Sequence, residues 1–247
     1  INLMKENIEY LESIAKIYNS RLFTYQIGET KLTSIKDNKY PLEAYLRLFV
    51  PKYINVDKLL YIDTDTIITG DLESLYNTDL SVFSIAAVPE MTPQTKININ
   101  NKRLNLPFDN KYFNSGVLLM DIKKIRAENS FNKILDWIIE NESIIEYADQ
   151  DGFNYHFANN YQELKPVFNL PAKYKYKLNQ KPLIIHFTTY RKPLSCGFKI
   201  NFIEDFKYFY SKTKYSNELL SRRKIRCFLK SLIIKFKSKI KGLVVKN

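Results

Sequence analysis

The chain has few cysteines and no long apolar run. Of its 247 residues, only Cys196 and Cys227 are cysteines. Two cysteines make no disulfide framework, so we expect a reducing, cytosolic compartment. No apolar segment approaches the roughly 18 residues that a membrane-spanning helix needs. No signal peptide is expected, because no charged-then-apolar leader is present, and a start at Ile1 rather than Met predicts a fragment or a processed chain.

Net positive charge is scarce outside the C-terminal segment. The formal net charge is +12. Residues 211–247 carry twelve Lys or Arg and a single acid, Glu218, whereas residues 1–210 carry twenty-six basic and twenty-five acidic side chains. A nearly neutral body argues against a nucleic-acid-binding function of the body, because neutralising phosphates requires a positive surface. The 45% hydrophobic content is ample for a buried core.

Strand and helix patterns alternate along the body. The periodicity predicts strands at 21–27, 58–63, 82–88, 116–122 and 181–187, and helices at 1–18, 41–50, 123–141 and 150–159. A polar loop or short helix is expected up to about residue 112. This alternation predicts an α/β fold with a mostly parallel sheet and helices on both faces. Ligands of such sheets bind at the carboxyl ends of the strands, where Asp63, Asp65 and His186 are expected.

The Asp-x-Asp of "LLYIDTDTII" directly follows an apolar strand. Two carboxylates on one side of a tight turn repel each other, and a divalent cation between them relieves that repulsion. The alternative is a loop whose aspartates cap a helix or face solvent. For an isolated Asp-x-Asp that alternative is favoured, because the tripeptide is common.

Four blocks resemble the conserved blocks of glycosyltransferase family 8 and follow one another in the same order. They are "AYLRLFVPKYINVDKLLYIDTDTIITGDLESLYNTDL", "YFNSGVLLMDIKKIR", "YADQDGFNYHF" and "IIHFTTYRKPL". The family contains retaining nucleotide-sugar transferases, among them lipopolysaccharide galactosyl- and glucosyltransferases and glycogenin. The resemblance implies the GT-A fold, a single Rossmann-like α/β domain.

The resemblance also implies the roles of individual residues. Asp63, Asp65 and His186 would hold Mn²⁺, with Mg²⁺ as the alternative, against the diphosphate of UDP-galactose or UDP-glucose. Gln150 and Asp149 would be the catalytic residues, with Gln150 beside the anomeric carbon. The implied donor-binding residues are Arg47, Asp63, Thr64, Asp65, Asn114, Ser115, Gly116, Asp149, Gln150, His186 and Lys192. Singly, each of these has a plain structural alternative: Asp149 as a helix N-cap, Lys192 as a surface lysine, His186 as a core histidine. His156 is expected to be a core histidine.

Two positions depart from the family pattern: Thr189 stands where a glycine is usual, and Leu194 where a tryptophan is usual. Family members also begin with a strand and helix that contact the uracil and ribose, and from the resemblance we expect this sequence to start after that portion. Two functions therefore stay open. One is a hexosyltransferase acting on a lipopolysaccharide, lipooligosaccharide or other lipid-linked glycan acceptor. The other is a catalytically inactive GT-A-like protein that binds membranes.

The C-terminal segment combines an apolar stripe with positive charge. The stripe runs at helical spacing through Ile225, Phe228, Leu229, Leu232, Ile233, Phe236, Ile240 and Leu243. This pattern is typical of a helix lying on an anionic bilayer. A helix packed on the body and a basic disordered tail are the alternatives. We expect a glycosyltransferase domain at 1–210 and a membrane-associating tail at 211–247, which would place the protein on the inner face of the cytoplasmic membrane.

Overall fold

The computed structural model describes residues 4–28, 31–36, 39–174, 180–188, 193 and 201–216. Lys192, Thr189, Leu194 and most of the expected tail, 217–247, lie outside the described residues. Among those described, no helix is long and apolar enough to cross a membrane.

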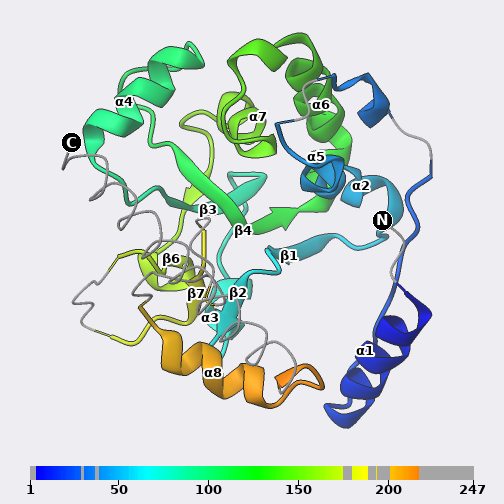
Figure 1. Cartoon of the computed structure of the whole chain (residues 1–247). Coiled ribbons are helices and arrows are strands. Elements are labelled where there is room, and N and C mark those ends of the chain that lie inside the picture. The colour runs from blue at the N-terminus through cyan, green and yellow to red at the C-terminus, as the bar shows by residue number, and fades with distance from the viewer. Residues whose placement is uncertain are drawn as a thin grey trace, which may run out of the picture.

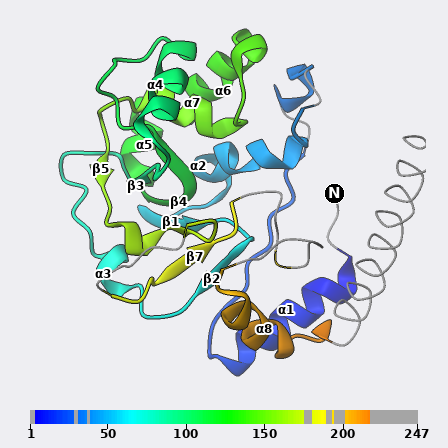
Figure 2. The same cartoon turned by 60° about the vertical axis from the view of Figure 1, so that its left-hand side comes forward.

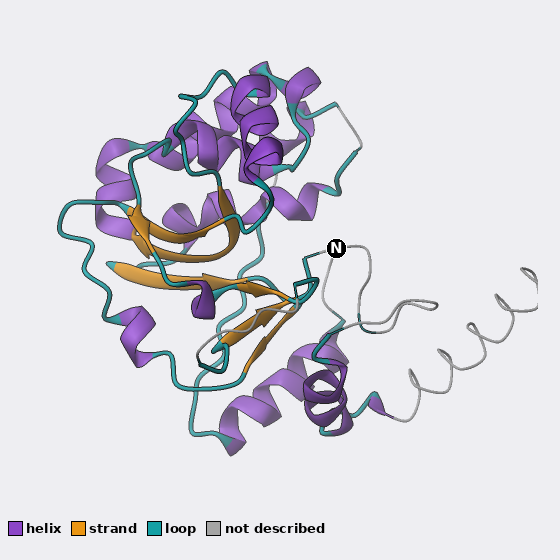
Figure 3. Cartoon of the chain, turned by 90° about the vertical axis from the view of Figure 1, so that its left-hand side faces the viewer, coloured by secondary structure: helices purple, strands orange, loops and turns teal. Residues whose placement is uncertain are grey.

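Two small sheets form the centre of the body (Figures 1 and 3). The first has the order β1-β4-β3-β5, with bounds β1 Lys58–Ile62, β4 Phe113–Asp121, β3 Ile85–Pro89 and β5 Gln162–Glu163. The second has the order β2-β7-β6, with bounds β2 Thr66–Ile68, β7 Ile184–His186 and β6 Leu170–Pro171. The short turn between β1 and β2 joins the two sheets.

The expectation of a mostly parallel sheet is wrong for the described strands. β4 runs antiparallel to both of its neighbours, β1 and β3, and β2 is antiparallel to β7. Among the strands that the structure describes, only β3 with β5 and β6 with β7 are parallel pairs. The apolar run of β4 is buried along nearly its whole length. Burial on both faces gives the same sequence pattern in either strand direction, so the pattern could not reveal the reversal.

Helices cover the first sheet mainly on one face. Leu118 and Met120 point into a core formed with α5 Ile122–Glu128, α6 Ser130–Glu140 and α7 Asp149–His156, together with the 3₁₀ helix η2 Leu42–Phe49. Val117 and Leu119 point to the opposite face, against Leu75 of α3 Glu73–Tyr76 and the second sheet. This alternation is the period of two expected of a strand buried on both sides.

The remaining elements lie around this core. They are α1 Lys5–Ile17, η1 Lys31–Ser34, α2 Val50–Tyr53, α4 Gln94–Arg103, η3 Glu142–Ile144, η4 Pro166–Phe168 and α8 Ile203–Ser211. α1 lies beside α8 at one end of the molecule (Figure 2). Tyr215 donates a hydrogen bond of 2.6 Å to Asn7 Oδ1, and Lys214 forms an ion pair of 3.0 Å with Glu6. The first residues of the expected tail therefore pack on the body.

Two other expected elements differ in the structure. Residues 21–27 form no strand: Phe23 is 66% exposed, and the segment has no ladder partner among the described residues. The helix expected over 123–141 is two helices that meet at Asn129, whose φ of 53° is left-handed. Asparagine tolerates that conformation better than most residues, and it ends α5 there.

Candidate active site

The Asp-x-Asp turn is fixed to both sheets. The Asp63 amide donates a hydrogen bond of 2.8 Å to the carbonyl oxygen of Gly116 in β4. The Asp65 carbonyl oxygen accepts a bond of 2.9 Å from the Phe187 amide, just past β7. Within the turn, Thr66 Oγ1 donates to the Asp63 carbonyl oxygen at 2.9 Å. The backbone of each aspartate is therefore held by a different sheet.

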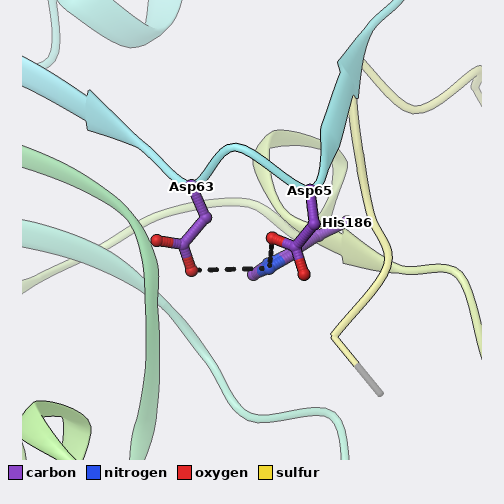
Figure 4. A group of neighbouring side chains, drawn as sticks. All are labelled: Asp63, Asp65 and His186. Carbon is purple, nitrogen blue, oxygen red and sulfur yellow. Dashed lines mark hydrogen bonds and ion pairs between the residues drawn. The ribbon is translucent and has the colours of Figure 1, made fainter. Parts of the chain in front are cut away.

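His186 ends β7 and faces both aspartates (Figure 4). Its Nε2 lies 3.1 Å from Asp65 Oδ1 and 3.6 Å from Asp63 Oδ2. The three ligand atoms lie within 4.8 Å of one another. Two carboxylates and an imidazole are a mixed oxygen and nitrogen donor set that fits a divalent transition metal such as Mn²⁺. The three residues named from the sequence thus form a site that fits a cation.

Gly116 leaves the space that this cluster occupies. A Cβ at this position would lie 2.1 Å from His186 Cε1 and 2.7 Å from Asp63 Oδ2. No side chain fits there without displacing the ligands. The pairing of β3 with β4 shifts at this point, from Ala87 with Leu118 to Val88 with Asn114. This bulge leaves residues 115–117 unpaired with β3, and Ser115 and Gly116 of this segment lie at the site.

Arg47 connects the cation cluster to Asp149. Its Nη2 lies 3.1 Å from Asp63 Oδ1, its Nε lies 2.7 Å from Asp149 Oδ2, and its Nη1 donates to the Ser115 carbonyl oxygen at 2.6 Å. The guanidinium also lies 4.2 Å from the ring centre of Tyr61, whose hydroxyl donates to Asp63 Oδ1 at 2.7 Å. Arg47 and Tyr61 thus occupy Asp63 Oδ1, and Oδ2 is the oxygen that faces His186.

Asp149 is 3% exposed and begins α7. Burial raises the pKa of its carboxyl to about 6, and the Arg47 guanidinium opposes that rise. The residue before it, Ala148, has a φ of 48°, a conformation that non-glycine side chains rarely adopt. Such backbone strain is concentrated at functional sites.

Gln150 lies against the Asn114–Gly116 segment. Its Oε1 accepts hydrogen bonds of 3.1 Å from both Asn114 Nδ2 and the Ser115 amide. Its Nε2 donates to the Tyr112 hydroxyl at 3.3 Å. Of the residues named from the sequence, Thr64 is exposed on the turn and Lys192 lies outside the described residues. All the others come together.

Sequence reasoning missed several residues that hold this site. Tyr61 contacts Arg47 and Asp63, while Asn169 contacts His186 and Asn114. The fully buried Asp151 pairs with Arg103 at 2.8 Å and accepts a bond of 2.6 Å from Tyr112. Asp151 and Tyr112 lie in the blocks that resemble family 8, but the sequence assigned neither of them a role. Nothing in the sequence pattern marks Asn169, since its partners are distant along the chain.

A sequence profile of "Glycosyl transferase family 8" matches residues 2–194, most of the chain. The chain belongs to glycosyltransferase family 8. General stress protein A of Bacillus subtilis is 26% identical over 193 residues, covering 70% of this chain and 66% of that protein. Glycosyltransferase GlyF of Streptococcus pneumoniae is 25% identical over 226 residues, and the match covers 87% of this chain and 54% of GlyF.

A third relative is a lipopolysaccharide 1,2-glucosyltransferase of Escherichia coli, which is 27% identical over 206 residues. The match covers 76% of this chain and 60% of that protein. The family 8 chain thus spans about half to two thirds of the length of the curated relatives that it matches.

Two solved structures show the fold. The bifunctional glycosyltransferase WbbM superposes with a TM-score of 0.73 at 21% identity, over 90% of this chain and 44% of that one. The galactosyltransferase LgtC, in complex with donor and acceptor sugar analogs, gives 0.57 at 23% identity, over 65% and 63%. The α/β GT-A fold expected from the family 8 blocks is therefore confirmed.

Proposed function

We propose that the protein transfers a hexose, galactose or glucose, from a UDP-sugar to a saccharide acceptor, with retention of the anomeric configuration. The convergence of Asp63, Asp65 and His186 beside Gly116 and Gln150 supports this proposal most directly. A divalent cation, Mn²⁺ or in its place Mg²⁺, would be held by these three side chains and would supply positive charge to the diphosphate that leaves.

The other side chains of the site would bind and orient the sugar. The Asp149 carboxylate, which pairs with Arg47, would accept hydrogen bonds from sugar hydroxyls. The side-chain amide of Asn114, next to Gln150, would also help to hold the sugar. Gln150 would lie beside the anomeric carbon. During transfer the bond from that carbon to the diphosphate oxygen breaks, with its electron pair leaving on UDP. A new bond forms to the acceptor hydroxyl oxygen, and the proton of that hydroxyl is released to solvent. Retention is a property that this proposal takes from the family.

The acceptor would be a glycan linked to a lipid, as in lipopolysaccharide or lipooligosaccharide. The lipopolysaccharide 1,2-glucosyltransferase of Escherichia coli supports this class of acceptor. The cationic C-terminal segment supports a place on the inner face of the cytoplasmic membrane, because Lys and Arg near an anionic bilayer each contribute about 1 kcal/mol of attraction. Lys192 would add a positive charge near the diphosphate.

A screen of UDP-sugars for UDP release tests the proposal. We expect release from UDP-galactose or UDP-glucose that requires Mn²⁺ or Mg²⁺ and stops when EDTA is added, in a chain that includes any residues that the gene encodes before Ile1. Binding of UDP-sugar without release, even with a saccharide acceptor present, would contradict the transferase proposal and favour the inactive binding protein.

A further inference from the structure

We propose that Asn169 is a positioning residue that sets which ring nitrogen of His186 carries the proton and, at the same time, fixes the amide of Asn114. The proposal rests on the proposed function, because the tautomer matters for a cation at His186. Asn169 is 1% exposed and lies between η4 and β6, next to the strand pair that carries His186.

The orientation of the Asn114 amide is fixed by a backbone group. The Gly116 amide lies 3.0 Å from one side-chain atom of Asn114. A backbone N–H can only donate, so the atom that it meets is the oxygen, Oδ1. Asn169 also places an atom 2.8 Å from this oxygen. That atom must be a donor, so it is Nδ2 of Asn169.

The orientation of Asn169 follows, and with it the tautomer of His186. With Nδ2 facing Asn114, the Oδ1 of Asn169 faces His186 Nδ1 at 2.9 Å. An amide oxygen only accepts, so Nδ1 must carry the proton. In the neutral ring Nε2 then has a lone pair, and it points at the carboxylate oxygens of Asp65 and Asp63, 3.1 and 3.6 Å away. Three atoms with lone pairs facing one another are stable together when a cation lies between them.

The second hydrogen bond of Asn169, to Asn114, connects it to Gln150. Once Asn114 Oδ1 is held by Gly116 and Asn169, Asn114 Nδ2 is left to donate to Gln150 Oε1 at 3.1 Å. The Ser115 amide donates to the same Gln150 oxygen at 3.1 Å, so a second backbone group requires the same orientation. Asn169 thus joins a cation ligand and the residue beside the reacting sugar through one amide side chain.

The two histidines of the chain allow a direct measurement. His156 takes no part in this chain of hydrogen bonds and serves as an internal reference. ¹⁵N spectra of the imidazoles, recorded on the metal-free full chain at a pH at which the spectra themselves show a neutral His186 ring, distinguish the two tautomers. We expect the Nδ1–H form at His186. The Nε2–H form in the wild-type protein would overturn the proposal.

Asn169→Leu removes the two side-chain hydrogen bonds of residue 169, to His186 and to Asn114, at similar side-chain volume. We expect it to lose the Nδ1–H preference and to weaken Mn²⁺ binding by about 10- to 100-fold in calorimetric titrations, the usual cost of losing a partner of a metal ligand. Asn101→Leu is the matched control, because Asn101 is also 1% exposed and pairs with Asn110 away from the site. The control should keep the tautomer and the Mn²⁺ affinity. An Asn169→Leu protein with the wild-type spectrum and an affinity within about twofold overturns the proposal.

Asn169→Asp keeps the hydrogen bond to His186 and removes the one to Asn114, so it tests the proposal even if the leucine variant does not fold. Its carboxylate still accepts from Nδ1–H but cannot donate to Asn114. We expect the Nδ1–H form to persist, Mn²⁺ binding not to weaken, and kcat to fall more than tenfold while KM for the donor changes little. Loss of the Nδ1–H form, or an unchanged kcat, contradicts the proposal. A wild-type protein that has the Nδ1–H form but binds no Mn²⁺ refutes the metal in the proposed function and leaves the role of Asn169 standing.

Discussion

Arg47 and Asp149 form a buried ion pair, with Nε 2.7 Å from Oδ2. The same guanidinium reaches Asp63 Oδ1 at 3.1 Å, so one side chain from η2 aligns the carboxylate that would meet the sugar with a carboxylate that would hold the cation. The single positive charge of Arg47 balances only part of the negative charge of these two carboxylates. The titration of Asp149 is therefore the first property to test.

The stability of the fold should depend on the protonation of Asp149. Burial raises the pKa of this carboxyl from 3.8 to about 6, so between about pH 4 and pH 6 the folded state binds more protons there than the unfolded chain. The contribution of Asp149 to the free energy of unfolding falls as pH rises through that window, by on the order of 2 kcal/mol. Urea unfolding of the wild-type protein and of Asp149→Asn should show a difference in stability that changes by this amount. A difference that is constant with pH would contradict the assignment.

Asp65→Ala should abolish Mn²⁺-dependent binding of UDP while the protein stays folded. The substitution removes one of the three groups that would hold the cation, whereas an exposed aspartate usually contributes less than about 0.5 kcal/mol to stability. Asp109→Ala, at an exposed position away from the site, is the control. Calorimetric titrations with Mn²⁺ and UDP measure the effect, and unchanged titration curves for Asp65→Ala would rule out its role as a ligand.

Gly116→Ala should weaken Mn²⁺ binding and destabilise the fold by about 1–3 kcal/mol, because the new methyl group overlaps His186 and Asp63. Gly28→Ala is the matched control, since a Cβ there would meet nothing within 4 Å. Thermal unfolding with and without Mn²⁺ distinguishes the two variants. Equal behaviour of the two alanine variants would mean that the cluster relaxes freely around position 116.

Gln150→Ala should lower kcat much more than it weakens UDP binding, because Gln150 would touch the reacting sugar and not the nucleotide. Steady-state kinetics together with UDP titration separate the two effects. Asp149→Asn should also impair transfer, through lost hydrogen bonds to sugar hydroxyls. An equal loss of kcat and UDP affinity in Gln150→Ala would indicate a structural role through its bonds to Ser115 and Tyr112.

Deletion of residues 217–247 should release the protein from anionic vesicles. It removes ten Lys or Arg, one acid and the apolar stripe, but keeps the contacts of Lys214 and Tyr215 with α1. Co-sedimentation should show that the full chain prefers anionic over neutral vesicles and is released in part by high salt. In the full chain, Phe228→Ser together with Phe236→Ser should make vesicle binding fully reversible by salt, because only the inserted apolar face resists screening. Vesicle binding that survives the deletion would refute the membrane role of the tail.

The sequence by itself determined the α/β class and the family, and it named most residues of the candidate site. Apolar runs predicted β1, β3, β4 and β7, and local spacing marked Asp63 and Asp65, because strand burial and strand-end carboxylates leave a signal within a few neighbouring residues. Gln150 was marked only by the resemblance of its block to family 8. The left-handed Asn129 that divides one expected helix in two left no such signal in the periodicity.

Only the tertiary structure decided the direction of β4, the absence of a strand at 21–27 and the role of Asn169. Strand direction depends on which neighbours a strand meets, and a strand forms only where a partner offers a ladder. Asn169 lies 55 residues from Asn114 and 17 from His186, so its function exists only in the hydrogen bonds that the fold brings together. The sequence specifies these amides, but a side chain that acts by orienting distant partners has no local pattern of its own.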